Sequence, residues 1–189
     1  ANKLWNAARF VLMNLGEDEP APYIPENLAT EDKWIISRFN TLVKTVQNSL
    51  ENYELGIAVQ NLYDFIWDVF CDWYIEIAKI RLNGEDIEAK KTVKAVLVYV
   101  MSNTLKLLHP FMPFITEEIY CTLLPEEESI MISAWPEYKD EFAFETEEAE
   151  VVTYNKSFTY ELFVKARTML FSNHDFVVKT PKGFKKYEQ

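Results

Sequence analysis

Apolar residues recur at steps of three and four along most of the first 124 residues of this chain, as is typical of helices that bury one face. The pattern predicts five helices, over residues 2–15, 31–51, 55–82, 85–108 and 113–124. The third has the longest apolar stripe, which aromatic residues widen, so we expect this helix to be central. A proline-rich connection follows the first helix and short loops join the others. The sequence therefore predicts an all-α helical bundle.

The segment LLHPFMPFITEEIY (107–120) places two prolines three residues apart inside an apolar run. Proline lacks the amide donor and clashes with the preceding turn, so the fourth helix must end before Pro110, whereas Pro113 suits the first turn of the next helix. We therefore predict a tight corner between two helices. The apolar residues around the prolines are expected to be buried in the bundle; they are Leu107, Leu108, Phe111, Met112, Phe114 and Ile115.

The pattern changes after residue 124. Residues 129–138, SIMISAWPEY, are more typical of an extended strap lying over the bundle than of another helix. Residues 139–150 form an acidic run that we expect to be exposed. Residues 151–171 fit either a helix or a hairpin, and the choice stays open. The expected domains are the helical bundle with its strap, 1–145, and a basic C-terminal extension of uncertain fold, 146–189.

Charge is distributed unevenly along the chain. Residues 1–150 contain 12 Lys and Arg against 27 Asp and Glu, a net charge of −15, whereas residues 151–189 have a net charge of +4. The acidic body argues against indiscriminate nucleic-acid binding, which depends on a broad positive field. No apolar run reaches the length of a membrane span, and the first residues lack the pattern of a secretory signal. We therefore expect a cytoplasmic protein with no membrane partner.

Few residues offer catalytic or metal-binding chemistry. Cys71 and Cys121 each lie alone in an apolar helical pattern, as buried thiols do, and the four glycines are too scattered to form a phosphate-binding loop. Neither His109 nor His174 follows a Glu by three residues, as a carboxylate-bridged metal centre in a bundle would require. His109 is instead expected to be a hydrogen-bonded histidine of the core. We assign no catalytic residue, metal ligand or cofactor to this chain.

The first helix has two contrasting faces when it is projected at about 100° per residue. One arc is apolar and consists of Leu4, Trp5, Ala8, Val11, Leu12 and Leu15. The opposite face offers amides, one guanidinium and one aromatic ring, and consists of Asn2, Lys3, Asn6, Arg9, Phe10, Met13 and Asn14. Amides and Arg hydrogen-bond the edges of unpaired bases, and aromatic rings stack on them. The alternative is that this face packs on another helix, with Arg9 paired to Asp68 or Asp72.

A second group of cations offers possible phosphate contacts. Lys79 and Arg81, near the end of the third helix, lie close in sequence to Lys90, Lys91 and Lys94 at the start of the fourth. The alternative is that these side chains compensate the helix dipole and are otherwise solvated. Both interpretations stay open at this point.

Four segments together resemble a known family: NKLWNAARFVLMN (2–14), YDFIWDVFCDWYIEIAK (63–79), LLHPFMPFITEEIY (107–120) and SIMISAWPEY (129–138). In order and spacing they resemble the anticodon-binding helical domain of valyl-tRNA synthetase, a class I aminoacyl-tRNA synthetase, over about residues 2–145. The resemblance implies a five-helix bundle that binds the anticodon stem-loop of valine tRNA. Asn6, Arg9 and Phe10 occupy matching motif positions. Taken with the rest of that helix face, the expected anticodon contacts are Asn2, Asn6, Arg9, Phe10 and Asn14, and the expected phosphate contacts are Lys3, Lys79 and Lys90.

Two departures from the family pattern limit what the chain can do. The HIGH-type and KMSKS-type adenylate-binding motifs are absent, so we expect an inactive C-terminal fragment whose partners are valine tRNA and a catalytic domain that binds ATP and magnesium. After Glu147 the chain also lacks the Arg-Asn-x-Arg-type run and the coiled-coil arm usual in bacterial relatives. The rival hypothesis is a stand-alone helical protein-interaction module that has lost tRNA binding, which the acidic body favours.

Overall fold

The structure is a computed structural model that describes residues 2–16, 23–149, 151, 176–180 and 183–187. The chain divides into two compact units, residues 1–151 and 152–189. The first unit is helical and extends past residue 145, where we expected the bundle to end. Within the described residues, no helix is both long enough and apolar enough to cross a membrane.

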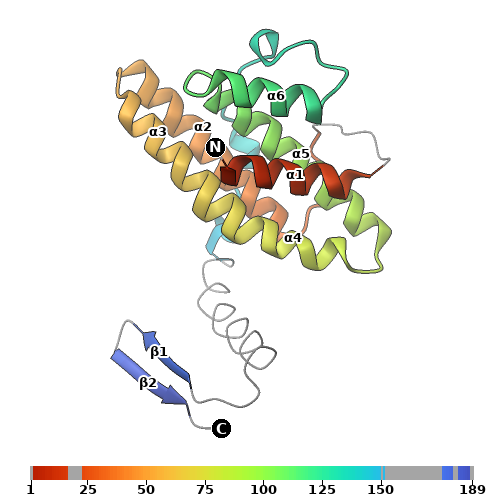
Figure 1. The fold of residues 1–189 in the computed structure, drawn as a ribbon, viewed down its shortest axis with the longest axis vertical. Coiled ribbons are helices and arrows are strands. Elements are labelled where there is room, and N and C mark those ends of the chain that lie inside the picture. The colour runs from red at the N-terminus through yellow and green to blue at the C-terminus, as the bar shows by residue number, and fades with distance from the viewer. Residues whose placement is uncertain (1, 17–22, 150, 152–175, 181–182, 188–189) are drawn as a thin grey trace. The chain divides into compact units, whose positions relative to one another are not determined.

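Among the described residues, the main helical segments of the bundle are α1 (Asn2–Leu15), α2 (Thr30–Glu51), α3 (Leu55–Asp64), the π-helix η1 (Phe65–Tyr74), α4 (Ile75–Leu82), α5 (Ile87–Leu108) and α6 (Pro113–Leu123). Because Phe65 and Ile75 at the two junctions keep right-handed helical backbone angles, α3, η1 and α4 form one continuous rod over residues 55–82 (Figure 1). All five predicted helices are thus confirmed. The π-helical middle of the rod was not predicted, because apolar spacing over so short a segment does not distinguish π turns from α turns.

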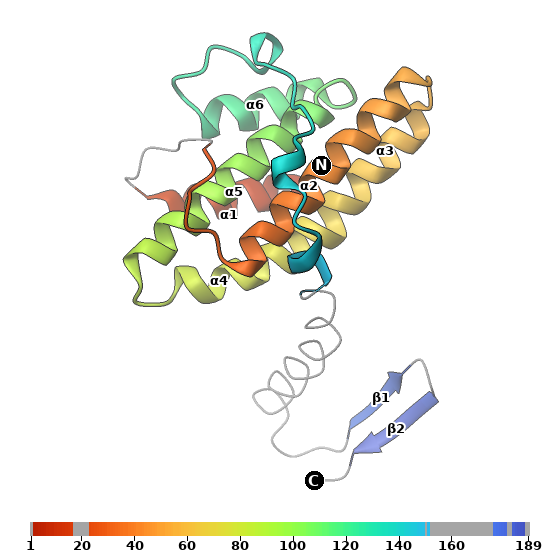
Figure 2. The same ribbon diagram turned by 180° about the vertical axis from the view of Figure 1, so that it is seen from behind.

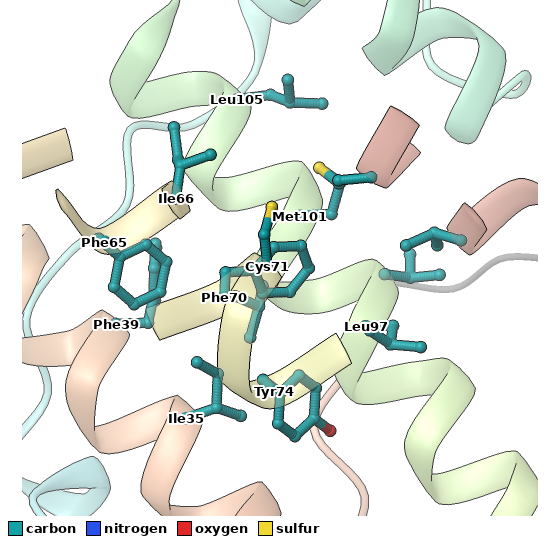
Figure 3. Packing of buried hydrophobic residues seen from close by; sticks show 14 of the residues in the cluster. Ile35, Phe39, Phe65, Ile66, Phe70, Cys71, Tyr74, Leu97, Met101 and Leu105 are labelled. Atoms are coloured by element: carbon teal, nitrogen blue, oxygen red, sulfur yellow. The ribbon is translucent and has the colours of Figure 1, made fainter. Parts of the chain in front are cut away.

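The core of the bundle lies between the rod, α2 and α5. Figure 3 shows side chains from all three gathered in one region, among them Ile35, Phe70, Tyr74 and Leu97. α5 contacts α1, α2, α3, α4 and α6, so it holds the central position that we expected for the rod. The rod keeps one face in solvent, and its exposed apolar residues include Leu55, Ile57, Val59 and Tyr63.

The corner between α5 and α6 has the predicted form. α5 ends at Leu108, whose carbonyl accepts hydrogen bonds from the amides of Phe111 (3.0 Å) and Met112 (3.1 Å), and Pro113 occupies the first turn of α6. The prediction that every apolar residue here is buried was wrong for Phe114, whose exposed fraction is 91%. The buried stripe of α6 consists of Thr116, Ile119, Tyr120 and Leu123. Because Phe114 lies two residues before Thr116, it falls on the opposite side of that helix.

The predicted strap, residues 129–138, and the acidic run after it form one segment, residues 129–149, which is called the strap from here on. Its first part contacts α6, and its later part crosses α2 on the face of the bundle seen in Figure 2, opposite the face that carries α1. The Asn40 side chain donates a hydrogen bond to the carbonyl of Lys139 (2.8 Å) and accepts one from its amide (2.9 Å). Lys33 pairs with Glu147 at 2.9 Å, and its hydrogen bond lowers the pKa of that carboxyl. The predicted strap is confirmed, but part of the acidic run is docked on α2. The strap contains two short 3-10 helices, η2 (Ile130–Ile132) and η3 (Asp140–Phe142).

The described part of the second unit is an antiparallel hairpin of β1 (Phe176–Thr180) and β2 (Gly183–Tyr187). Its register places Phe176 opposite Tyr187 and Thr180 opposite Gly183. The segment for which helix and hairpin stayed open lies outside the described residues, apart from the helical Val151.

Candidate nucleic-acid interface

α1 lies on the face of the bundle seen in Figure 1, where it packs on α5 and α6 and beside η1. Its buried residues follow the helical repeat and are Leu4, Ala7, Ala8, Val11 and Leu15. Trp5 belongs to the same apolar arc but is not buried with them, since its exposed fraction is 47%. Trp5 is about 120° around the helix from Val11, at the edge of the apolar arc, and no neighbouring helix covers it completely.

The outer face of α1 carries the exposed residues Asn2, Asn6, Arg9 and Met13. Among the described residues, none forms a hydrogen bond or ion pair with the side chains of Asn2, Asn6 or Arg9. The alternative in which Arg9 pairs with Asp68 or Asp72 is therefore not what the structure contains. Three polar side chains on one exposed helix face remain free to hydrogen-bond a ligand.

The edge of α1 that faces η1 is occupied by Lys3. Its ammonium lies 2.6 Å from the Asp72 carboxylate, 3.3 Å from the Trp67 carbonyl and 5.5 Å from the centre of the Trp67 ring. The hydrogen bond to Asp72 raises the pKa of Lys3 above its ordinary value. Lys3 is thus a charged residue that already has an anionic partner, so a phosphate must compete with Asp72 for it.

Phe10 and Lys79 form a second contact on the same edge. The half-buried Phe10 ring lies 5.6 Å from the Lys79 ammonium, which also pairs with Glu76 at 2.6 Å. The Asn14 amide donates one N–H to the Phe10 carbonyl at 2.8 Å, which leaves its side-chain oxygen and its second N–H open to a ligand. Phe10 and Asn14 therefore flank the outer face rather than lie at its centre.

The second group of cations is not a single open patch. Arg81 turns inward to Asp32 (2.6 Å) and Glu31 (3.2 Å). Burial opposes its charge, but the hydrogen bond to the buried Asp32 raises the pKa of Arg81 above its ordinary value. Lys91 pairs with Glu88 at 3.1 Å, whereas Lys90 has no carboxylate partner among the residues that the structure describes. Of the predicted phosphate contacts, Lys90 is therefore the one whose charge is not already paired.

A hollow that sequence reasoning missed opens between α1 and α6. Its volume is about 120 Å³, and its lining residues are Trp5, Ala8, Arg9, Leu12, Ile119 and Thr122. Arg9 thus lies at the border between the polar outer face of α1 and this hollow, whose lining is almost wholly apolar. Sequence could have indicated this from the position of Trp5 at the edge of the arc, but the wall that α6 contributes depends on the packing of two helices distant in sequence.

The side chains of the outer face of α1 are suited to recognising a ligand. Amides, a guanidinium and aromatic rings can hydrogen-bond and stack on unpaired bases. His109 lies 2.7 Å from the Thr116 hydroxyl, so it is hydrogen-bonded as expected, but it is half-buried at the corner and not part of the core. The described residues contain no group of three His, Cys, Asp or Glu side chains placed to hold a metal ion. The fold and its exposed face together define an all-α helical domain with a polar face that is open to a ligand.

Comparison with known proteins identifies this domain more closely. A family model described as the anticodon-binding domain of tRNA ligase matches residues 32–170. The chain is 49% identical to the valine–tRNA ligase of Staphylococcus carnosus over 146 residues and 52% identical to that of Thermotoga maritima over 150 residues. These matches cover 76% and 79% of the chain but only 17% of each relative. The chain belongs to the family of anticodon-binding domains of tRNA ligases.

A solved structure shows the same fold. It is the agnB2 LeuRS of Agrobacterium radiobacter K84 in a ternary complex with tRNA and LeuAMS, with a TM-score of 0.55 and 19% identity over 75% of this chain and 16% of that chain. At this identity the likeness concerns the fold alone. None of these comparisons supports a stand-alone interaction module. The family match begins at residue 32, so the roles of the α1 residues stay predictions.

Proposed function

We propose that this chain is the anticodon-binding part of a valine–tRNA ligase and that it binds the anticodon loop of valine tRNA. The family match and the valine–tRNA ligases among its relatives support the proposal. The observation that carries it is the outer face of α1, where Asn2, Asn6 and Arg9 are exposed and have no partner among the described residues. In an otherwise acidic domain, such a face suits hydrogen bonds to base edges better than broad attraction to phosphates.

Each group on this face has a distinct role in the proposal. The amides of Asn2 and Asn6 pair donor and acceptor atoms with base edges, and Arg9 donates from a planar fork that also stacks on a base. Phe10 and Asn14 border the loop on the side of η1. Lys90 contacts a phosphate directly. Lys3 and Lys79 can do so only after their ion pairs with Asp72 and Glu76 break.

The ligase reaction itself belongs to the rest of the protein in this proposal. ATP and magnesium bind to a catalytic domain of the parent protein, which is the other partner of this domain, and the protein works in the cytoplasm. The isolated chain should then show no amino-acid-dependent pyrophosphate exchange above a denatured control. Exchange by the isolated chain would contradict the assignment of catalysis to another domain.

The proposal is tested by measuring binding to a stem-loop RNA with the valine anticodon and to one with a changed central anticodon base. The unmodified chain should prefer the valine loop. Arg9→Ala should weaken binding by about 1–3 kcal/mol and narrow that preference, because it removes a base contact. Arg9→Lys should weaken binding and narrow the preference in the same way, because lysine keeps the charge but lacks the planar guanidinium.

The matched control is Arg38→Ala. Arg38 is a partly exposed arginine of α2 that lies 3.9 Å from Glu148 of the strap, and the strap is on the face opposite the one that carries α1 (Figures 1 and 2). Its loss should leave both affinities unchanged. Equal affinity of the unmodified chain for the two loops would refute anticodon recognition. Equal effects of Arg9→Ala and Arg38→Ala would refute the assignment of recognition to α1.

Phosphate contacts have a different signature. Lys90→Ala should weaken binding to every loop alike and reduce the slope of log affinity against log salt by about one unit. Lys91→Ala is the control, because Lys91 is already paired with Glu88. A selective effect of Lys90→Ala on the valine loop would show that Lys90 contacts a base instead.

A further inference from the structure

The hollow between α1 and α6 is not explained by the packing of the bundle. α1 contributes Trp5, Ala8, Arg9 and Leu12 to its lining, and α6 contributes Ile119 and Thr122. The recess has one wall from each helix, and its lining is almost entirely apolar. Trp5, at its rim, is a large aromatic side chain whose exposed fraction is 47%. An exposed tryptophan beside an apolar recess is a feature that a bound ring would cover.

We infer that this hollow accepts one unpaired base of the anticodon loop, turned out of the loop and inserted between α1 and α6. The hollow is open on one side, and its volume of about 120 Å³ is below the roughly 150 Å³ of a closed apolar cavity that holds one benzene ring, so a base enters it in part and keeps one edge outside. The occupant is flat and has apolar faces, as the two apolar walls require. The inference rests on the proposed function and specifies where on that surface one base is bound.

The polar atoms at the rim also suit a base. Arg9 presents only hydrogen-bond donors and has no partner among the described residues. The Thr122 hydroxyl donates its proton to the Glu118 carbonyl at 2.7 Å, so its oxygen is left to a ligand as an acceptor. A base edge that has an acceptor beside a donor can pair with both. A simple phosphate lacks the donor and the apolar faces, and an aliphatic side chain lacks the polar edge.

The experiment fills the hollow without touching Arg9. Thr122 is exposed at the rim, so Thr122→Phe should be tolerated by the fold and should place a ring where the base would lie. The control is Thr45→Phe, because Thr45 is a threonine of α2 whose hydroxyl likewise donates to the carbonyl four residues earlier, that of Thr41. Trp5→Ala is the second variant, which removes one wall and adds no volume.

Binding is measured with the valine anticodon stem-loop and with three copies of it, each abasic at one anticodon position. Thr122→Phe and Trp5→Ala should each weaken binding of the complete loop by about 5- to 150-fold, the range for loss of one stacked base, whereas Thr45→Phe should not. For one abasic loop, and only that one, the unmodified chain and Thr122→Phe should bind equally. That loop identifies the inserted base.

Two results would overturn the inference while leaving the proposed function standing. In the first, the unmodified chain prefers the valine loop but Thr122→Phe and Trp5→Ala bind it as tightly as the unmodified chain does. In the second, Thr122→Phe weakens the complete loop and all three abasic loops by the same factor, so that no single base depends on the hollow. Failure of the unmodified chain to distinguish any of the loops would instead overturn the proposed function, and this inference with it.

Discussion

Replacing Arg81 by methionine should lower the free energy of unfolding of the helical unit by about 2–4 kcal/mol. Asp32 has an exposed fraction of 0% and accepts hydrogen bonds from Arg81 (2.6 Å), the Tyr74 hydroxyl (2.7 Å) and the Ala29 amide (3.2 Å). Removing one partner of a buried ion pair costs about 3–5 kcal/mol, because it leaves a buried charge uncompensated. The Arg81 side chain keeps 18% of its surface in solvent, so we expect a loss of stability somewhat below that range.

This network joins the start of α2 to the end of the rod. Burial and the Asp32 carboxylate both raise the pKa of Tyr74 well above its ordinary value, so its hydroxyl stays a donor. Methionine preserves most of the aliphatic packing of Arg81, and the measured loss therefore reports the stranded carboxylate. Because the rod also carries Lys79 beside Phe10, the network helps to set the edge of the candidate interface.

The assay is urea unfolding followed by far-ultraviolet circular dichroism. Lys91→Met is the control, because the side chains of Lys91 and its partner Glu88 have exposed fractions of 61% and 83%, and such pairs contribute less than about 1 kcal/mol. Adding Asp32→Asn to Arg81→Met should restore part of the loss, since the amide carries no charge. The reasoning is refuted if Arg81→Met and Lys91→Met are equally stable.

Three further predictions concern stability. Burial raises the pKa of Cys71 to about 11 from an ordinary value of 9.0, so between these pH values the folded protein keeps a proton that the unfolded chain releases. The free energy of unfolding should therefore fall as pH rises from 9 to 11, and it should fall less steeply in Cys71→Ala. Leu105→Ala should cost about 2–5 kcal/mol and Phe114→Ala under about 0.5 kcal/mol in chemical unfolding, because the first side chain is buried and the second exposed. Asn40→Ala removes the partner of the Lys139 amide and one of the two donors to its carbonyl, which keeps the Phe142 amide at 3.1 Å. The loss of these two hydrogen bonds should cost about 1–3 kcal/mol and speed proteolysis within the strap; an unchanged cleavage rate would argue against this anchor.

Local rules determined the helices and the corner from the sequence. Apolar spacing is a property of a single segment, so it predicts where α1, α2, the rod, α5 and α6 lie without knowledge of their neighbours. The backbone chemistry of Pro110 and Pro113 is equally local, and it predicts the end of α5 and the start of α6. The four family-like segments likewise indicated the anticodon-binding fold before any packing was known.

Only the tertiary structure decided which side chains are free to bind a ligand. Trp5 and Phe114 are exposed although both are apolar, and Asp32 is buried although it is charged. Exposure depends on the helix that packs alongside, and that helix comes from a distant part of the chain. For the same reason the pairing of Lys3 with Asp72, which spans 69 residues, and the hollow that α6 completes beside Arg9 became apparent only in the assembled bundle.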